Sequence, residues 1–422
     1  MTRCMDEGWA AKARALDRYR WQLLRERHTL LGSIVRFARE AFSDCVFGLR
    51  ARGRLAVGGA AEPCDFLLLQ SAPKVIALQR KKLLIGALRE RGYKLTETAL
   101  DTSRNVLAGR RLIKPPHYVP VRYFGYAAHA EWLVQQYAPR VLLNDRNGSL
   151  YSPFLRLSLN ARGGFLVHLA HASTVESSRR LGMNDYDFYF LFGRSSLDAL
   201  AARALRFGSS MAVLAGSHMI DRTYDLSPAA VEWKTLLLLG VGPDKEKEPQ
   251  YQDTYDLVVD WARRHANYRV LVKRHPRSRA EYWSKVTQSV PNIELLPADC
   301  SLAEALSQAS LVVNVMSNAV IEAGLAARPV IYANCTLDAD VLAQERYFGR
   351  PVTTVVEFDQ RVSAIEADYS SACLVSSEFS KYHLSNGVAG LPTTIDLLSR
   401  LHAGQASELK AEALMGTIEE CH

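Results

Sequence analysis

The chain lacks both paired cysteines and long apolar segments. Its seven cysteines are an odd, scattered set, and no two of them form a Cys-x-x-Cys pair. This argues against a disulfide framework or a zinc knuckle and favours a reducing compartment, so we expect a cytoplasmic protein. The longest apolar runs, such as the one within residues 235–241, are far shorter than the roughly twenty residues that span a bilayer. Any membrane contact is therefore expected to be peripheral, at the inner face of the cytoplasmic membrane.

Several targeting and catalytic signatures are missing as well. The N-terminus carries Asp6 and Glu7 and has no apolar core of the kind found in a signal peptide, so none is expected. No P-loop, serine nucleophile elbow or His-Glu-x-x-His motif occurs. The stretch Gly240-Val-Gly-Pro243 lacks the third glycine of a dinucleotide fingerprint. We therefore predict no cofactor.

Positive charge is present in excess, and most of it lies at one end of the chain. The 422 residues are 48% hydrophobic and 23% charged, which suits two or three domains with real cores and excludes disorder. The formal net charge is +8, and residues 1–54 account for +6 of it. Such an excess favours an anionic partner. No nucleic-acid recognition motif accompanies it, so no nucleic-acid partner is predicted.

The first segment has helical periodicity. Apolar residues recur at steps of three, four and seven, namely Leu23, Leu30, Ile34, Phe37, Ala41 and Cys45. The pattern predicts a basic helical extension over residues 1–60. Two interpretations stay open: the apolar face packs on the rest of the protein, or residues 1–54 lie as a basic amphipathic helix on an anionic membrane.

From Cys64 onward, short β-rich runs alternate with helical stretches, which is typical of parallel sheets covered by helices. The first series has predicted strands at 65–70, 140–144, 165–170, 187–192 and 211–215, with helices at about 74–92, 127–138, 150–160 and 195–205. The second has predicted strands at 235–240, 268–273, 292–296, 310–315 and 329–332, with helices near 251–266, 279–288, 301–308 and 318–327.

We therefore predict an α/β protein with two Rossmann-like, doubly wound domains facing a cleft, after an N-terminal helical extension. The predicted boundaries are 1–60 for the extension, 61–228 and 229–395 for the two domains, and 396–422 for a C-terminal helical tail. Ligands are expected at the carboxyl ends of the strands, because open α/β sheets bind there.

A cationic cluster follows one strand of the second series. The sequence from Tyr268 to Arg277 is an apolar strand that ends in Lys273, Arg274, His275 and Pro276. The proline ends the strand, so the cations are presented where the chain leaves the sheet. Lysine and arginine can neutralise a phosphate there, and a histidine near phosphate tends to protonate and donate to the leaving oxygen. The alternative is a solvated basic turn.

A second candidate site follows the strand Leu311–Val315. The strand runs into Ser317, a good N-cap residue, and the predicted helix puts Asn318 and Glu322 four apart on one face. The N-terminus of that helix predicts an anion site that suits a nucleotide phosphate, with Glu322 accepting hydrogen bonds from ribose hydroxyls. An ordinary capped helix with a solvated glutamate is the alternative.

These motifs resemble those of a known group. Lys273-Arg-His-Pro276, Ala303-Glu-Ala-Leu-Ser-Gln-Ala-Ser310 and Ser317-Asn-x-x-x-Glu322, followed by Arg328-Pro-Val-Ile331, resemble the donor-nucleotide domain of glycosyltransferases with the GT-B fold. The sequence is most similar to bacterial enzymes that use cytidine-activated donors. These are the Kdo transferases of capsule export, the bacterial sialyltransferases with His-Pro and Ser-Ser/Thr motifs, and the CDP-glycerol glycerophosphotransferases of teichoic acid synthesis.

The first domain resembles the acceptor side of the same families. His171 falls on the histidine of a Gln-His-Gly or Trp-His-Gly motif, although Ala170 and Ala172 flank it here. The resemblance implies that His171 serves catalysis, and chemically it could act as a base on an acceptor hydroxyl. Asp145, at another predicted strand end, is the second catalytic candidate, as a base or a carboxylate nucleophile. Its alternative is a turn-forming aspartate, and His168 is predicted to be a hydrogen-bonded core histidine.

The resemblance implies transfer of a sugar, Kdo or another ulosonic acid, from a CMP-linked donor to a bacterial surface polysaccharide or glycolipid. Lys273, Arg274, His275 and Pro276 with Ser317, Asn318 and Glu322 would hold the nucleotide. Asp185-Tyr-Asp187 fits the Asp-x-Asp metal pattern, but it enters an apolar strand, so no metal is predicted. The alternatives are a CDP-glycerol or CDP-ribitol phosphotransferase, a nucleotide-sugar epimerase and a non-catalytic assembly subunit.

Overall fold

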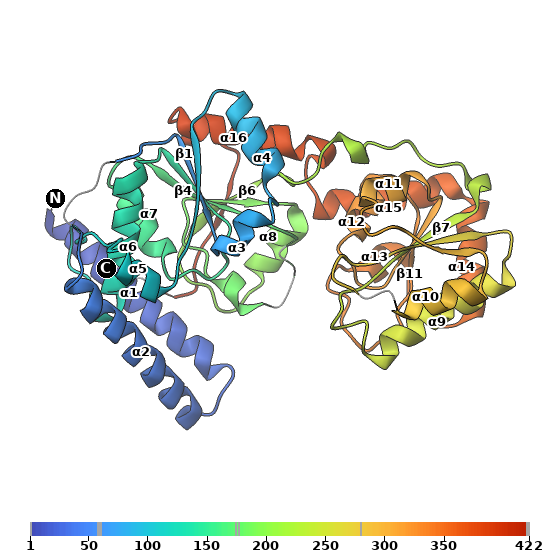
Figure 1. The fold of residues 1–422 in the computed structure, drawn as a ribbon, viewed down its shortest axis with the longest axis horizontal. Helices are drawn as coiled ribbons and strands as arrows, with labels where there is room; N and C mark the ends of the chain where they lie inside the picture. Colours follow the sequence, from blue (N-terminus) through green and yellow to red (C-terminus); the bar gives the residue numbers. More distant parts are fainter. Residues whose placement is uncertain (1, 57–60, 174, 176–177, 279–280, 419–422) are drawn as a thin grey trace. The chain divides into compact units, whose positions relative to one another are not determined.

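The computed structural model describes residues 2–56, 61–173, 175, 178–278 and 281–418. The chain divides into two compact units, each built around its own sheet (Figure 1). Unit 1 comprises Met1–Met219 and Leu391–His422, and unit 2 comprises Ile220–Gly390. The chain therefore leaves unit 1, builds unit 2 and returns.

Unit 1 contains a seven-stranded sheet in the order β12-β6-β5-β4-β3-β1-β2. The strands are β1 (Phe66–Gln70), β2 (Leu95–Ala99), β3 (Val141–Asn144), β4 (Phe165–Leu169), β5 (Phe188–Leu191), β6 (Ser210–Leu214) and β12 (Glu412–Leu414). All neighbours are parallel except β12 and β6, which are antiparallel. Central strands such as β1 and β3 are buried along their whole length, which explains their unbroken apolar sequences.

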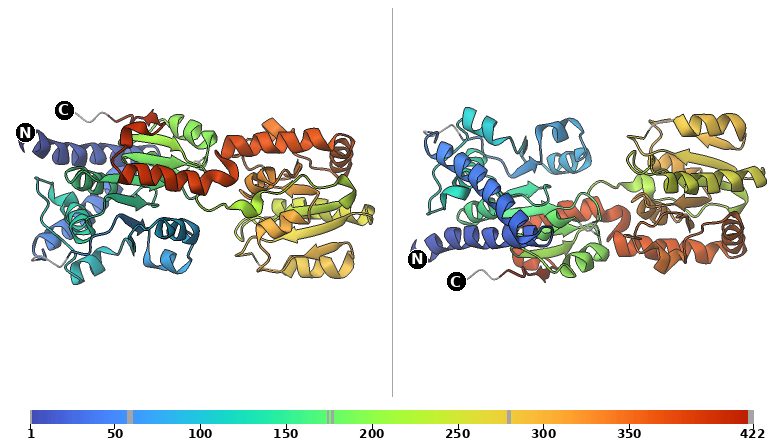
Figure 2. Two further views of the ribbon diagram at one scale, coloured as in Figure 1. Left: turned by 90° about the horizontal axis from the view of Figure 1, so that it is seen from above. Right: turned by 90° about the horizontal axis from the view of Figure 1, so that it is seen from below.

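The helices of unit 1 lie on both sides of this sheet (Figure 2). They are α1 (Thr2–Arg25), α2 (Leu30–Arg52), α3 (Pro73–Ala77), α4 (Lys82–Glu90), α5 (Ser103–Ala108), α6 (Val121–Tyr137), α7 (Ser152–Asn160), α8 (Arg194–Ala201) and α16 (Gly390–His402), with the short 3₁₀ helix η1 (Arg179–Gly182). Ile395, Leu398 and Leu401 of α16 belong to the same apolar core as the strands. Residues after Gly390 are thus part of unit 1.

The N-terminal segment forms two helices that belong to unit 1. Thr29 begins α2 as its N-cap, where its hydroxyl accepts a hydrogen bond from the Gly32 N–H. The Arg20 guanidinium contacts the buried Asp44 carboxylate (Nη1–Oδ2 2.7 Å), and Arg122 of α6 contacts Asp17 (Nη1–Oδ1 2.6 Å). These ion pairs join α1, α2 and α6. The segment therefore packs on the rest of unit 1, where Trp9 and Leu16 of α1 are also buried. The predicted face is not the buried one, since Leu30 and Ile34 are exposed and the other four of its six residues are only half-buried.

Unit 2 contains a five-stranded, all-parallel sheet in the order β11-β10-β7-β8-β9. Its strands are β7 (Thr235–Leu239), β8 (Arg269–Lys273), β9 (Ile293–Leu295), β10 (Leu311–Asn314) and β11 (Val330–Tyr332). Its helices are α9 (Pro249–Arg264), α10 (Glu281–Ser289), α11 (Leu302–Ser307), α12 (Val320–Leu325), α13 (Gln344–Phe348), α14 (Val355–Ala367) and α15 (Tyr369–His383). Aromatic side chains of the helices, including Trp261, Trp283 and Phe358, pack on the buried strands.

The ten predicted strands are all present, within a residue or two at their ends. Two strands were not predicted: β2, whose sequence is half polar, and β12, which has three residues and pairs with a strand far away in the sequence. The predicted helix at 74–92 is two helices, α3 and α4. Residues 396–422, predicted as a helical tail, instead combine most of α16 with the edge strand β12.

The close packing of α2 on α6 depends on Gly48. A Cβ atom at this position would lie 1.8 Å from the Val121 carbonyl oxygen. We expect Gly48→Ala to destabilise unit 1 by about 1–3 kcal/mol, because the two helices must move apart. Gly86→Ala on α4 is the matched control: its Cβ would meet nothing within 4 Å, so the helix gains up to about 1 kcal/mol. Urea unfolding followed by circular dichroism compares them, and equal midpoints would contradict the expectation.

Candidate functional site

A cavity of about 380 Å³ opens at the carboxyl ends of the strands of unit 2. It is lined by Leu239, Gly240, Lys273, Arg274, His275, Pro276, Ala298, Cys300, Ser301, Leu302, Ser317 and Ala319. These residues lie at or after the carboxyl ends of four strands that are adjacent in the sheet, in the order β10-β7-β8-β9. The cationic cluster after β8 and the serine after β10, which are distant in the sequence, therefore face one cavity.

Gly240 allows the ends of β7 and β8 to lie close together. A Cβ at Gly240 would meet the Arg274 Cα and the Lys273 carbonyl oxygen, both at 3.1 Å, and the His275 nitrogen at 3.2 Å. Any larger side chain at this position would press on the backbone that carries the cationic cluster. Gly240 was noted in the sequence only as part of an incomplete fingerprint, and its close approach to β8 was not predicted.

The hydrogen bonds of His275 fix its tautomer. Its Nδ1 accepts a hydrogen bond from the Arg277 N–H at 3.2 Å, so the proton of the neutral ring is on Nε2. Partial burial, together with the Arg277 guanidinium, lowers the pKa of His275 below its ordinary value of 6.5. The imidazole is therefore neutral at pH 7 and still presents an Nε2–H donor. A phosphate bound beside it would raise this pKa again.

Arg274 and Lys273 supply the positive charge. The Nη1 of Arg274 donates to the Ser278 carbonyl oxygen at 3.3 Å, while its buried Nε has no hydrogen-bond partner among the described residues. Lys273 is half-buried and close enough to Glu304 to lower the pKa of that carboxyl, after the larger effect of hydrogen bonds from Ser301. Lys273 and Arg274 therefore place positively charged N–H donors at the cavity, and the surrounding protein satisfies the hydrogen bonds of these donors only in part.

The loop after β9 forms a wall of the cavity that the sequence analysis missed. Ser301 is the N-cap of α11 in a capping box, in which its hydroxyl accepts from the Glu304 N–H and the Glu304 carboxylate accepts from the Ser301 N–H. The Ser301-x-x-Glu304 pattern is readable as a helix start. Nothing in that pattern indicates that Cys300 and Ser301 border the same cavity as His275.

The predicted cap of the following helix is wrong. Helix α12 begins at Val320 with Ala319 as its N-cap, because Asn314 Oδ1 first accepts a hydrogen bond from the Ser317 N–H and holds the chain in a turn. Asn318 therefore precedes the helix, is exposed and does not line the cavity. The helix has only six residues, so its terminus adds little to an anion site.

Glu322 also lies outside the set that lines the cavity. It is half-buried, and burial raises the pKa of its carboxyl to about 7. The carboxylate lies close enough to Tyr224 to raise the pKa of that phenol, after the larger effect of burial. The predicted four-residue pairing of Asn318 with Glu322 on one helix face does not form.

In unit 1, Asp145 and Lys81 form an ion pair. Asp145 follows β3, and its Oδ2 lies 2.6 Å from the Lys81 Nζ, with both side chains buried. The Asp145 Oδ1 has no hydrogen-bond partner among the described residues. The carboxylate is therefore held by a cation and is buried. Its predicted catalytic role stays a prediction.

Three histidines lie near one another at the carboxyl ends of the strands, and two of them, His168 and His218, lie near Lys81. His168 on β4 is buried and stacks on Tyr186, with ring centroids 4.4 Å apart, which confirms a core histidine. His218, after β6, has its pKa lowered to about 3, first by burial and then by Lys81 and His171. His171 follows β4, is exposed, and is near enough to both other imidazoles to lower their pKa values. Lys81 and His218 were missed because they are isolated in the sequence.

The Asp-x-Asp tripeptide is engaged with cations of the protein. Asp185 accepts from Lys12 at 3.2 Å and from Arg156 Nη1 at 2.8 Å, and Asp187 accepts from Arg156 Nε at 2.9 Å. Within the described part of the chain, no group of three potential metal ligands occurs. These two carboxylates thus hold α1 and α7 against the sheet.

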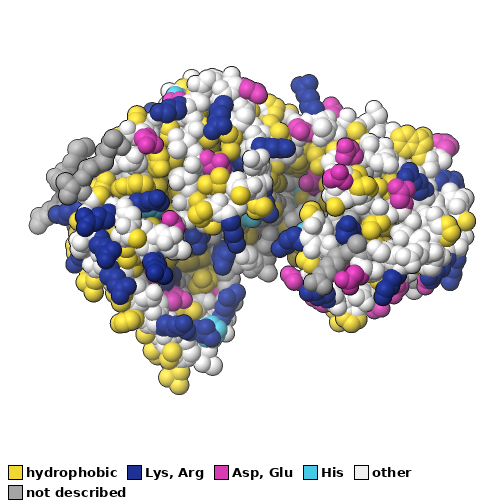
Figure 3. Space-filling model, viewed as in Figure 1, with side chains coloured by type: hydrophobic (Ala, Val, Ile, Leu, Met, Phe, Trp, Pro, Cys, Tyr) yellow, Lys and Arg dark blue, Asp and Glu magenta, His cyan; other side chains and the backbone are white. Residues whose placement is uncertain are grey.

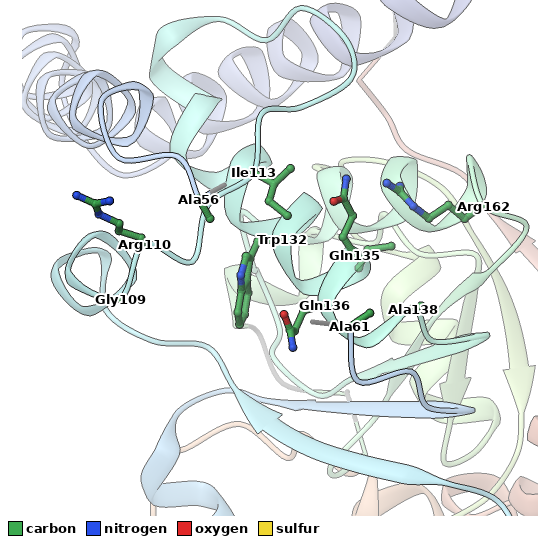
Figure 4. A pocket seen from close by; sticks show the side chains of 11 residues that line it. Ala56, Ala61, Gly109, Arg110, Ile113, Trp132, Gln135, Gln136, Ala138 and Arg162 are labelled. Carbon is green, nitrogen blue, oxygen red and sulfur yellow. The ribbon is translucent and has the colours of Figure 1, made fainter. Parts of the chain in front are cut away.

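Unit 1 also has a cavity of about 770 Å³ beside the second half of α6 (Figure 4). Its wall includes Arg110, Trp132, Gln135, Gln136 and Arg162. The end of α6 precedes β3, so this cavity lies toward the amino ends of the strands. It contains none of the predicted site residues.

Comparison with known proteins supports the fold. Neither a protein-family model nor a curated protein sequence matches the chain. Among solved structures, a putative UDP-N-acetylglucosamine 2-epimerase from Listeria monocytogenes is similar, with a TM-score of 0.52 and 11% identity over 81% of this chain and 97% of that one.

Two further structures are similar at the same level. A UDP-N-acetylglucosamine 2-epimerase has a TM-score of 0.50 and 10% identity over 83% of this chain and 98% of that one. The S. aureus MnaA–UDP co-structure has a TM-score of 0.50 and 12% identity over 82% and 99%. At these identities the likeness shows the fold alone, and the predicted α/β fold with two Rossmann-like domains is confirmed.

The buried ion pair in unit 1 gives a stability prediction. Asp145→Asn leaves the Lys81 ammonium buried and unpaired, so we expect a loss of about 3–5 kcal/mol. Lys81→Met combined with Asp145→Leu removes both charges and should recover most of it. Asp198→Asn, in the exposed pair with Arg194, is the matched control and should cost less than about 1 kcal/mol. Urea unfolding measures all three, and a neutral Asp145→Asn would refute the expectation.

Proposed function

We propose that the chain is a glycosyltransferase and that the cavity of unit 2 binds the nucleotide of its activated-sugar donor. One observation carries the proposal: Lys273, His275 and Ser317 line a single cavity at the carboxyl ends of parallel strands. A cation, an imidazole N–H and a hydroxyl together match the acceptor oxygens of a phosphate. This edge is also where open α/β sheets bind their ligands.

In this proposal the cavity stabilises the departing nucleotide. Lys273 and Arg274 neutralise its phosphate, and the Nε2–H of His275 donates to the oxygen on which charge develops. Asn318 and Glu322 are left out of the binding set, since neither lines the cavity. In unit 1, His171 or Asp145 acts on the acceptor hydroxyl or at the anomeric carbon.

The proposal also names the nucleotide-linked sugar that serves as donor. The sequence motifs favour CMP-linked Kdo or another ulosonic acid, transferred to a surface polysaccharide or glycolipid. The similar structures are instead UDP-N-acetylglucosamine 2-epimerases and a complex with UDP. We therefore keep the CMP-linked donor as the first candidate and a UDP-linked sugar as the second.

A nucleotide-sugar epimerase is the second candidate function, because all three similar structures cited above are of that kind or bind UDP. An epimerase needs no acceptor, whereas a transferase or a CDP-polyol phosphotransferase adds mass to one. The mass added to the acceptor separates the last two. An assembly subunit with a degenerate site would bind no nucleotide.

Nucleotide titration tests the proposal. By calorimetry, at least one of CMP, CDP and UDP should bind the full chain. His275→Ala should weaken that binding by about tenfold to a hundredfold, because a donor to a charged oxygen is lost. With a donor and acceptor in hand, its turnover should fall by on the order of a hundredfold.

The matched control for this experiment is His265→Ala, which changes a histidine of unit 2 that lies outside the cavity lining. It should leave nucleotide binding unchanged. Failure of all three nucleotides to bind would favour the assembly-subunit alternative. Equal binding by His275→Ala and the parent chain would remove His275 from the site.

The proposal includes a peripheral contact between α2 and an anionic membrane. No helix in the described part of the chain is long and apolar enough to cross a bilayer. Helix α2 nevertheless exposes one row of large apolar side chains at steps of four and seven, formed by Leu31 (76% exposed), Val35 (66%), Phe42 (72%) and Leu49 (59%).

This row lies opposite the face that packs on α6, where Asp44, Phe47 and Ala51 are buried. The exposed residues Arg39 and Arg50 lie on one side of it. Figure 3 shows Lys and Arg side chains beside hydrophobic ones over this part of unit 1. An apolar row beside arginines suits the interface of an anionic bilayer.

Two neighbouring positions test this contact. Phe42→Glu places a carboxylate in the apolar row and should reduce flotation with anionic phosphatidylglycerol vesicles by about tenfold, since burying a phenylalanine contributes roughly 1.5–3 kcal/mol. Ser43→Glu adds the same charge beside the row and should reduce flotation far less. The test uses point variants. Deleting residues 1–54 would remove α1, which is part of the core of unit 1. Equal flotation of Phe42→Glu and the parent would reject the contact.

A further inference from the structure

Unit 1 contains another cavity, of about 610 Å³, at the carboxyl ends of its parallel strands. Its lining comes from the segments that follow β1, β2 and β3, together with η1 and one turn of α6. These residues are Ser71, Ala72, Pro73, Leu100, Asp101, Thr102, Ser103, Tyr126, Arg146, Asn147, Gly148, Ser149, Leu150, Tyr151 and Arg180. All of them belong to unit 1, so the cavity is separate from the nucleotide cavity proposed above.

Two arginines give this cavity its charge. Arg146 and Arg180 are exposed, and neither guanidinium has an ion-pair partner among the described residues. Gly148 brings them together: its φ is +68°, and a Cβ there would lie 3.0 Å from the Arg180 Cβ, so η1 rests against the loop that carries Arg146. Both cations therefore border the same space.

The one acidic residue of the lining is already compensated. The Asp101 Oδ1 accepts from the Thr102 N–H at 2.9 Å and from the Asn105 Nδ2 at 2.7 Å, while its Oδ2 lies 3.6 Å from the Arg111 Nη1. The cavity thus keeps a net positive charge. A ligand that suits it carries at least one anionic group.

The rest of the lining matches a sugar. Hydroxyl and amide groups of Ser71, Thr102, Ser149 and Asn147 line the space. The Thr102 and Ser149 hydroxyls already accept from backbone N–H groups and the Asn147 Oδ1 pairs with His168, but the two hydroxyls keep their O–H donors and Asn147 keeps its NH₂ group for sugar hydroxyls. Tyr126 and Tyr151 form an aromatic corner, with ring centroids 5.1 Å apart. Aromatic surface with a few polar groups and two guanidinium groups is a combination that fits a carboxylated sugar ring better than a bare anion.

The cavity also borders the group formed by Lys81 and the nearby histidines His168, His171 and His218. The Asn147 Oδ1 lies 2.8 Å from the His168 Nε2, and Asn144 lies 3.2 Å from the other ring nitrogen of His168. Arg146 directly follows Asp145, the partner of Lys81. A sugar held by Arg146 would therefore lie beside the residues that the proposed function assigns to the acceptor.

We propose that this cavity is the acceptor subsite and that it selects an acidic sugar, with Arg146 and Arg180 binding its carboxylate. The proposal rests on the proposed transferase function and names the class of its acceptor. The arginines are binding residues here, and their guanidinium groups pair with the carboxylate while the hydroxyl and amide groups orient the ring.

The test uses the full chain and three probes. Tri-galacturonic acid carries carboxylates, its methyl ester has the same shape without charge, and inorganic phosphate is a small anion. In saturation-transfer NMR titrations we expect the acid to bind at least tenfold more tightly than the ester or phosphate. Arg146→Gln and Arg180→Gln should each weaken binding of the acid by about tenfold or more, as for a lost bond to a charged group.

Arg89→Gln is the matched control, because Arg89 is exposed on α4 of the same unit and does not line the cavity. Equal binding of the acid and the ester, or equal affinities of the parent and both arginine variants, overturns the inference. Phosphate binding as tightly as the acid also overturns it. A parallel titration with CMP, CDP and UDP separates the two proposals: nucleotide binding without sugar binding rejects the acceptor subsite alone, and sugar binding without nucleotide binding rejects the proposed donor site.

Discussion

Parallel strand pairing is the constraint on which the rest of the structure depends. In a parallel sheet every strand ends at the same edge, so the segments that follow β7, β8 and β10 must meet whatever their separation in the sequence. That constraint places His275 and Ser317 at one cavity, although 41 residues lie between them in the sequence. Gly240 tightens the arrangement, because the absence of a side chain lets the end of β8 lie against β7.

At the carboxyl ends of the strands of unit 1, burial changes the ionisation of titratable side chains. The Lys81 ammonium is held by Asp145, and together with burial it keeps nearby imidazoles such as His218 neutral. With its pKa lowered to about 3, His218 stays uncharged at pH 7 and is a weak base there. The charge of Lys81 therefore affects not only Asp145 but also the pKa values of nearby histidines. These histidines lie at the carboxyl ends of the strands, where the acidic sugar is proposed to bind.

Sequence patterns predicted this protein well where local chemistry and position coincide. Short, mainly apolar runs bounded by polar residues predicted ten of the strands, and Pro276 predicted the point where the cationic residues leave the sheet. Patterns failed where a distant contact decides the outcome. The hydrogen bond from the Ser317 N–H to Asn314 moves the start of α12, and Lys81 gains its importance only through a carboxylate 64 positions away.

The N-terminal helices show a different limit of sequence analysis. Helical periodicity tells that a face is apolar, but α2 has two such faces, one packed on α6 and one exposed. The predicted face lies between these two, with Leu30 and Ile34 exposed and Phe37 half-buried, so packing and membrane contact each concern a face other than the predicted one. The side chains of Leu31, Val35 and Phe42 are largely exposed, so the packing of unit 1 does not explain why this row is apolar. Contact with an anionic bilayer would explain it, and in the proposed function that contact would bring the chain to the surface where a glycolipid acceptor lies.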